Sequence, residues 1–102
     1  MGQATNEVTV AASAREDLRE LAEYWEDAGE PARAQKYVAD LLAAAHTLED
    51  MEIARRGKPL PDCGVPDVRE IRVFNRVYRI VFRLDDAGRH VEIIRFWHSH
   101  RD

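Results

Sequence analysis

Three strand-like segments follow one another in the last third of the chain, with only short connections between them. They span residues 68–74, 77–84 and 90–97, and two and five residues separate them. Connections this short join antiparallel neighbours, because a parallel pair needs a crossover of a dozen or more residues. The sequence therefore predicts a three-stranded antiparallel meander over 68–97.

Alternation within 77–84 separates an apolar face from a basic face. Successive side chains of a strand point to opposite faces, and unpaired arginine is rare in a core. The side chains expected to face a core are Tyr78, Ile80, Phe82 and Leu84. Arg79 and Arg83 are then expected on the opposite, open face of the sheet.

Alternation in 90–97 does not identify the inward face, so two interpretations of the basic face remain open. If His98 shares the face of Arg79, the face combines cations with an imidazole that titrates near neutral pH. Otherwise the face is an ordinary solvated surface whose arginines pair with carboxylates. The carboxylates available for such pairs are Glu70, Asp85 and Glu92.

The first half of the chain predicts a helical hairpin. Ser13 and Glu16 have the spacing of a capping box, and apolar side chains then recur every three or four residues through a helix over 13–28. Pro31 suits the first turn of a second helix with its own apolar stripe, expected over 31–50. Because the link is short, the helices are expected to lie antiparallel.

The remaining segments complete an α+β domain of order β-α-α-β-β-β. Residues 8–10 alternate as a short strand, and 54–66 carries enough proline and glycine to predict a loop. Each helix must bury its stripe, so the hairpin is expected to cover one face of an antiparallel sheet and to leave the face with Arg79 and Arg83 open. No boundary for a second domain interrupts 1–102.

Charge is divided unevenly along the chain. Residues 1–54 hold four Lys/Arg and twelve Asp/Glu, whereas residues 55–102 hold eleven and seven, within a net charge of −4. The acidic half argues against a protein that coats nucleic acid non-specifically. The local basic surface is compatible with a phosphate-bearing or acidic partner.

Several other classes of protein and site are disfavoured. No apolar run approaches the ~20 residues of a membrane span and no leader opens the chain, so we expect a cytoplasmic protein without a membrane partner. Cys63 is the only cysteine, which suits a reducing compartment. His98 and His100 lack a supporting carboxylate or thiolate, so neither a metal nor another cofactor is predicted.

Short motifs recur in order over nearly the whole chain. They are the opening VTVAASAREDLRELAEYW, RGKP at 56–59, REI at 69–71, YRIVFR at 78–83, and VEII at 91–94 leading to FWH at 96–98 and Arg101. This ordered set resembles the ParE/RelE superfamily of toxins from bacterial type II toxin–antitoxin modules. The resemblance implies a RelE/ParE-like fold and a toxin that a cognate antitoxin neutralises in a hetero-oligomer.

The resemblance implies one of two activities. RelE-like members cut messenger RNA on the ribosome with basic residues of the open sheet face and, in several, a tyrosine or histidine near the C terminus, whereas ParE-like members poison DNA gyrase. Metal-free RNA cleavage needs a proton acceptor, cations that stabilise the phosphorane and an acid for the leaving oxygen. In a nuclease, Arg79, Arg83 and His98 would carry these roles.

The nuclease set is incomplete in this sequence. YoeB-like nucleases end in a His-Tyr pair and have a glutamate in the Pro-rich segment before the sheet, whereas here Ser99 follows His98 and Leu60 stands near the place of the glutamate. We therefore favour a ParE-like plasmid stabilisation toxin that acts on DNA gyrase. The alternatives are a ribosome-dependent mRNA endonuclease and a degenerate, non-toxic binding member.

The basic face also predicts where the antitoxin binds. We expect acidic residues of an extended or helical antitoxin segment to contact Arg72, Arg79 and Arg83. The full set of expected partner-binding residues is Arg72, Arg79, Arg83, Arg95, Trp97, His98 and Arg101.

Overall fold

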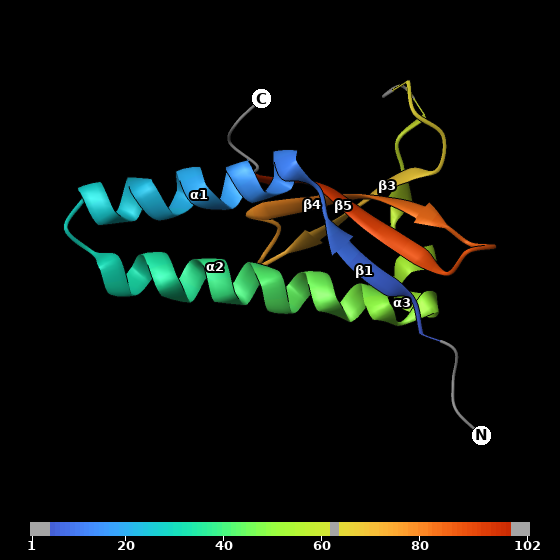
Figure 1. The fold of residues 1–102 in the computed structure, drawn as a ribbon, viewed down its shortest axis with the longest axis horizontal. Coiled ribbons are helices and arrows are strands. Elements are labelled where there is room, and N and C mark those ends of the chain that lie inside the picture. Colours follow the sequence, from blue (N-terminus) through green and yellow to red (C-terminus); the bar gives the residue numbers. More distant parts are fainter. Residues whose placement is uncertain (1–4, 62–63, 99–102) are drawn as a thin grey trace.

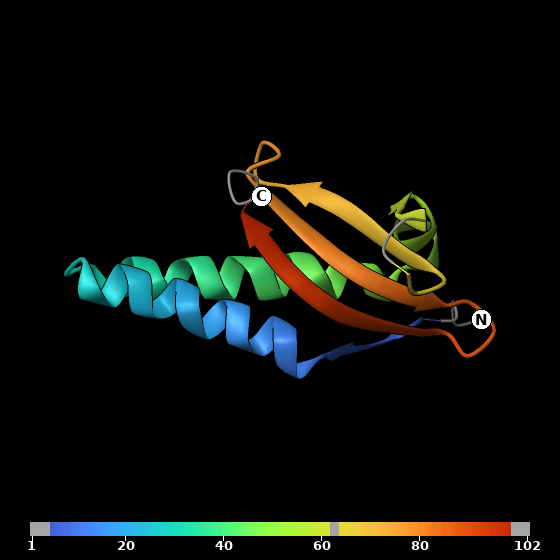
Figure 2. The ribbon, with the colours of Figure 1, turned by 90° about the horizontal axis from the view of Figure 1, so that it is seen from above.

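A helical hairpin packs against one face of a twisted sheet (Figure 1, Figure 2). The computed structural model describes residues 5–61 and 64–98. In chain order its elements are β1 (Glu7–Val10), α1 (Ala12–Asp27), α2 (Pro31–His46), the 3-10 helix η1 (Thr47–Glu49), α3 (Met51–Arg55), β2 (Lys58–Pro59), β3 (Val68–Val73), β4 (Tyr78–Asp85) and β5 (His90–His98). The predicted α+β class is confirmed.

The sheet has the strand order β1-β5-β4-β3-β2 in the described part of the chain. The antiparallel meander of β3, β4 and β5 is confirmed, but the sheet is not wholly antiparallel. β1 lies parallel to β5, with Val8 opposite Val91. The helices between these strands supply the long crossover that a parallel pair requires. β2 adds a short outer strand to β3, with Lys58 opposite Glu70.

The core lies between the hairpin and the sheet. Alternate residues of β4 are buried as predicted, with Ile80 and Phe82 fully so, while Tyr78 is half-buried at the end of the strand. The largest fully buried side chains are Phe82, Leu41, Leu48, Ile80, Ile93 and Val91. Burial of each such side chain contributes about 1.5–3 kcal/mol relative to exposure, so this layer holds the hairpin on the sheet.

The boundaries of the first helix differ from the prediction. α1 begins at Ala12 after an extended Ala11, and the side chain of Ala11 makes no capping hydrogen bond. The predicted capping box is therefore wrong. Ser13 lies in the first turn, and its hydroxyl donates to the carbonyl of Ile94 at 2.7 Å. Ser13 therefore links α1 to β5 and does not cap the helix.

The segment after α2 is more ordered than predicted. α2 ends at His46, four residues before the expected end, and η1 and α3 follow. Asp50 caps α3, because its carboxylate accepts from the backbone N–H of Glu52 at 2.8 Å. The expected loop over 54–66 therefore contains the end of α3 and all of β2.

A β-bulge in β5 decides which residues of that strand face the core. Val81 pairs with Arg95 but the next residue of β4, Phe82, pairs with Ile93, so Ile94 is an extra residue. An extra residue reverses the alternation. Val91 and Ile93 face the core before the bulge, and Phe96 and His98 face the hairpin side after it.

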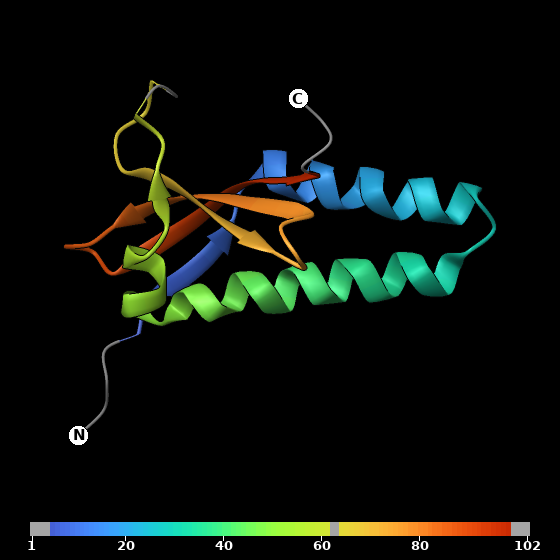
Figure 3. The same cartoon turned by 180° about the vertical axis from the view of Figure 1, so that it is seen from behind.

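The hairpin turn projects well beyond the sheet (Figure 3). Trp25 and Tyr37 join the two helices there, with ring centroids 5.4 Å apart. Gly29 allows the turn, because its φ of 79° lies in the left-handed region that favours glycine. No helix in residues 5–61 and 64–98 is long and apolar enough to cross a membrane.

Gly57 is expected to be intolerant of a side chain. A Cβ atom at this position would lie 2.7 Å from Cζ of Phe82 and 3.0 Å from Cβ of Arg69. Gly57→Ala is therefore expected to lower the free energy of unfolding by about 1–3 kcal/mol, measured by urea denaturation. Phe82→Leu removes the clashing ring atom, so Gly57→Ala should cost less in that background. An equal cost in both backgrounds would contradict this packing account.

Candidate functional site

The face of the sheet away from the hairpin carries long basic side chains. Directly opposed residues of neighbouring strands share a face. Arg72 lies opposite Arg79, which in turn lies opposite Trp97. We call this surface the arginine face, and its members on β3, β4 and β5 include Val68, Glu70, Arg72, Arg79, Val81, Arg83, Glu92, Arg95 and Trp97.

Glu70 lies at the centre of the arginine face and is only 5% exposed. One carboxylate oxygen is 3.5 Å from Nε of Arg72, and the other is 3.8 Å from Nη1 of Arg79. Both distances exceed the 2.7–2.9 Å typical of a charge-assisted hydrogen bond. Glu70 therefore offsets the charge of both arginines through two long ion pairs. The pairing of Glu70 with arginines agrees with the interpretation of this face as an ordinary solvated surface. The burial of Glu70 does not agree with it.

Trp97 lies close to two guanidinium groups. Cζ of Arg79 is 5.4 Å from the indole centroid, and Cζ of Arg95 is 4.9 Å from it. Both contacts are within the range of cation–π attraction. Three of the predicted partner-binding residues are thus adjacent in the structure, and the indole restricts the directions in which the arginines can point.

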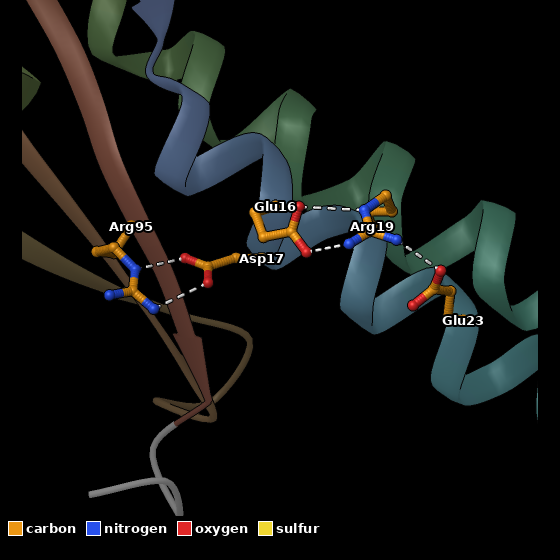
Figure 4. Close-up of polar contacts among 5 residues, drawn as sticks. All are labelled: Glu16, Asp17, Arg19, Glu23 and Arg95. Atoms are coloured by element: carbon orange, nitrogen blue, oxygen red, sulfur yellow. Dashed lines mark hydrogen bonds and ion pairs between the residues drawn. The ribbon is translucent and has the colours of Figure 1, made fainter.

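Arg95 is tied to α1 (Figure 4). Its Nε and Nη2 donate to the two carboxylate oxygens of Asp17 at 2.8 and 3.0 Å, and the backbone N–H of Phe96 donates to the same carboxylate at 3.0 Å. The hydrogen bonds accepted by Asp17 raise the pKa of the Arg95 guanidinium. β1 pairs with β5 only as far as Ile93. Beyond that residue, the carboxylate of Asp17 accepts the backbone hydrogen bond of Phe96 at the edge of β5.

Asp17 was not identified from the sequence. Its side chain is only 4% exposed, although aspartate is rarely buried without a partner. A signal exists in the helical pattern, because Asp17 lies three residues after buried Ala14 and next to buried Leu18, on the apolar stripe itself. A charged residue on such a stripe indicates a buried partner.

His98 lies on the other side of the sheet from Arg79. It is directly opposite Tyr78, and the two rings meet edge to face with centroids 5.1 Å apart. His98 and Tyr78 line a hollow of about 270 Å³ against α1, together with Tyr24 and Phe96. The structure therefore does not bring His98 together with Arg79 and Arg83.

Two further expectations concern this region. Arg101, together with Ser99 and His100, lies outside the described residues, so its predicted role in partner binding stays a prediction. Within 5–61 and 64–98, no group of three or more His, Cys, Asp and Glu side chains is placed to hold a metal ion.

Comparisons with known proteins identify a family and similar folds. A family model described as the ParE toxin of type II toxin–antitoxin system, parDE, matches residues 8–102. The chromosomal ParDE system from P. aeruginosa superimposes with a TM-score of 0.73 at 22% identity, over 94% of this chain and 98% of that chain, which supports the fold. The RelBE2 complex from Mycobacterium tuberculosis superimposes with a TM-score of 0.67 at 26% identity, over 93% and 99%. A search of curated proteins finds no match.

Proposed function

Because this chain belongs to the family of ParE toxins of type II toxin–antitoxin systems, we propose that it arrests growth by inhibiting DNA gyrase. Its similarity extends to both ParDE and RelBE complexes, so the choice of target rests on the site. The observation that carries the choice is the position of His98. Its ring packs on Tyr78, away from the arginine face.

Catalysis of RNA cleavage needs a proton-transfer group and cations at the same phosphate. The proton-transfer group must lie within hydrogen-bond reach of the proton that it moves. Arg79 and Arg83 lie on the arginine face, whereas His98 lies on the face that covers the hydrophobic core. An inhibitor of gyrase needs only a complementary contact surface, so this arrangement supports inhibition over catalysis.

The arginine face is also the proposed binding surface for the antitoxin. Arg83 is exposed, and the side chain of Arg72 is 39% exposed, so both can contact a partner without rearrangement of the sheet. Acidic residues of the antitoxin would complement them and form a toxin–antitoxin hetero-oligomer. Gyrase acts in the cytoplasm, so the proposal places the toxin there, consistent with a role in plasmid stabilisation.

A second candidate function is ribosome-dependent cleavage of messenger RNA. The observation that favours it is the contact between Trp97 and Arg79 on a basic face, because an aromatic ring beside cations suits a stacked base and a phosphate. In this candidate His98 would be the proton-transfer group, so the bound RNA would have to reach its ring, which packs on Tyr78 on the other side of the sheet.

Replacement of His98 by glutamine separates the two candidates. If the protein inhibits gyrase, no proton moves at His98, and His98→Gln is expected to change toxicity in a growth assay by no more than about 3-fold. Loss of a proton-transfer group would instead slow cleavage by roughly 100- to 10,000-fold. The purified variant is checked by thermal unfolding. Loss of toxicity with an unchanged Tm, together with ribosome-dependent cleavage by the wild type, would favour the nuclease.

A further inference from the structure

The arginine face is not uniformly positive, because a buried carboxylate occupies its centre. Arg79 and Arg83 are four residues apart on β4, about 13 Å along the strand. Val81 lies midway between them, opposite Glu70 on β3 and opposite Arg95 on β5, whose guanidinium is held by the carboxylate of Asp17. Val81 and Glu70 are both buried. A partner that spans the two arginines therefore passes over Glu70.

The carboxylate of Glu70 is expected to repel negative groups of such a partner. This carboxylate is removed from bulk water, so its interactions are screened less than those of an exposed carboxylate. Its two ion pairs are long, at 3.5 and 3.8 Å, and the side chain of Arg79 is only 19% exposed. The charges of both arginines are therefore partly offset, and a negative group placed over Val81 is repelled by Glu70.

We propose that Glu70 makes the arginine face selective for an acidic protein segment over nucleic acid. This inference rests on the proposed function, since it concerns the same surface. A nucleic acid strand carries a phosphate at every nucleotide, so a backbone that spans Arg79 and Arg83 places a charge near Glu70. An extended protein segment places only alternate side chains on the sheet and can leave the central one uncharged.

The spacing of the arginines defines the preferred partner segment. In an extended chain, residues i and i+4 are about 13 Å apart and point to the same side. Two carboxylates at this spacing match Arg79 and Arg83, and residue i+2 then lies over Val81 and Glu70. We therefore expect a partner segment with acidic residues at i and i+4 and an apolar residue at i+2.

The wild-type protein tests this geometry without any substitution. Binding of labelled peptides to the purified full chain is measured by fluorescence anisotropy. One peptide carries glutamates at i and i+4 with valine at i+2, and a second carries a third glutamate in place of the valine. The first should bind at least about 3-fold more tightly, although the second has more negative charge. Tighter binding of the second peptide would overturn the proposal, because a simple basic surface prefers the greater charge.

Glu70→Gln tests the role of the carboxylate itself, with a single-stranded RNA oligonucleotide as the second probe. The variant should bind this RNA about 10-fold more tightly than the wild type, and the slope of log K against log salt should steepen by about 0.7, the value for one further phosphate contact. The preference between the two peptides should also be lost. Unchanged RNA affinity in a folded Glu70→Gln protein would contradict the proposal.

A matched variant controls for net charge. Glu26→Gln makes the same change at an exposed position of helix α1, away from the arginine face. It should alter RNA affinity by less than about 3-fold, and a gain equal to that of Glu70→Gln would show that only net charge matters. These readouts do not involve gyrase. A wild type that cleaves messenger RNA but keeps the peptide preference would refute the proposed function and leave the inference about Glu70 intact.

Discussion

The Arg72→Glu/Arg83→Glu variant is expected to bind the cognate antitoxin at least about 100-fold more weakly than the wild type. Reversal of two exposed charges places like charges against the acidic residues proposed to contact the arginine face, and such contacts cost several kcal/mol. Each 1.4 kcal/mol corresponds to a tenfold change in Kd. Titration calorimetry at two salt concentrations measures the effect, and wild-type affinity should fall as salt rises.

A matched control reverses two exposed arginines of the hairpin, Arg19 and Arg33, and so changes the net charge by the same amount. This control should leave antitoxin affinity within about 3-fold of the wild type. Equal loss in both variants would show a general effect of charge. Unchanged affinity in Arg72→Glu/Arg83→Glu would show that the antitoxin binds elsewhere.

Asp17→Ala is expected to lower the free energy of unfolding by about 2–4 kcal/mol. Removal of one partner of a buried ion pair leaves the other uncompensated, at a cost of about 3–5 kcal/mol. Arg95 is 37% exposed, so water partly replaces the lost carboxylate and the expected cost is smaller. The backbone N–H of Phe96 also loses its acceptor. Urea denaturation measures the change.

Arg19→Ala is the comparison within the same helix. Arg19 forms ion pairs with Glu16 and Glu23, drawn in Figure 4 beside the Asp17–Arg95 pair. All three side chains are about half exposed. Exposed pairs of this kind contribute little, so Arg19→Ala should shift Tm much less than Asp17→Ala. Equal shifts in Tm in the two variants would show that the Asp17–Arg95 ion pair does not stabilise the contact between α1 and β5.

Much of the fold follows from local patterns in the sequence. The short links around β4 determine its antiparallel neighbours, and the alternation from Tyr78 to Leu84 identifies the buried face. The two apolar stripes identify the hairpin that covers this face. These features are predictable because each depends on residues close together in the chain, where periodicity reports burial directly.

Features that depend on distant contacts were not predictable in the same way. Ser13 has the spacing of a capping residue, yet its hydroxyl bonds to Ile94, which lies 81 residues away. The bulge at Ile94 follows from pairing with β4 and has no turn residue to mark it. The parallel pairing of β1 likewise depends on the tertiary fold, because its sequence alternates as any strand would.

The sequence predicts which arginines form the candidate site, but it does not predict how the other residues of the site are arranged. The sequence identifies Arg72, Arg79 and Arg83 as one basic face, and their register confirms that they share it. It does not show that His98 faces the hairpin, because one bulged residue reverses the alternation. It also does not show that Glu70 is buried, since strand alternation places it on the open face.

Gyrase activity in the presence of the purified toxin tests the central claim most directly. Supercoiling of relaxed plasmid by DNA gyrase is measured at increasing toxin concentration, beside a ribosome-dependent cleavage reaction that contains the same toxin preparation. We expect the toxin to inhibit supercoiling, added antitoxin to restore it, and messenger RNA to stay intact on the ribosome. Normal supercoiling together with cleaved messenger RNA would contradict the proposed inhibition of gyrase and identify the protein as a nuclease.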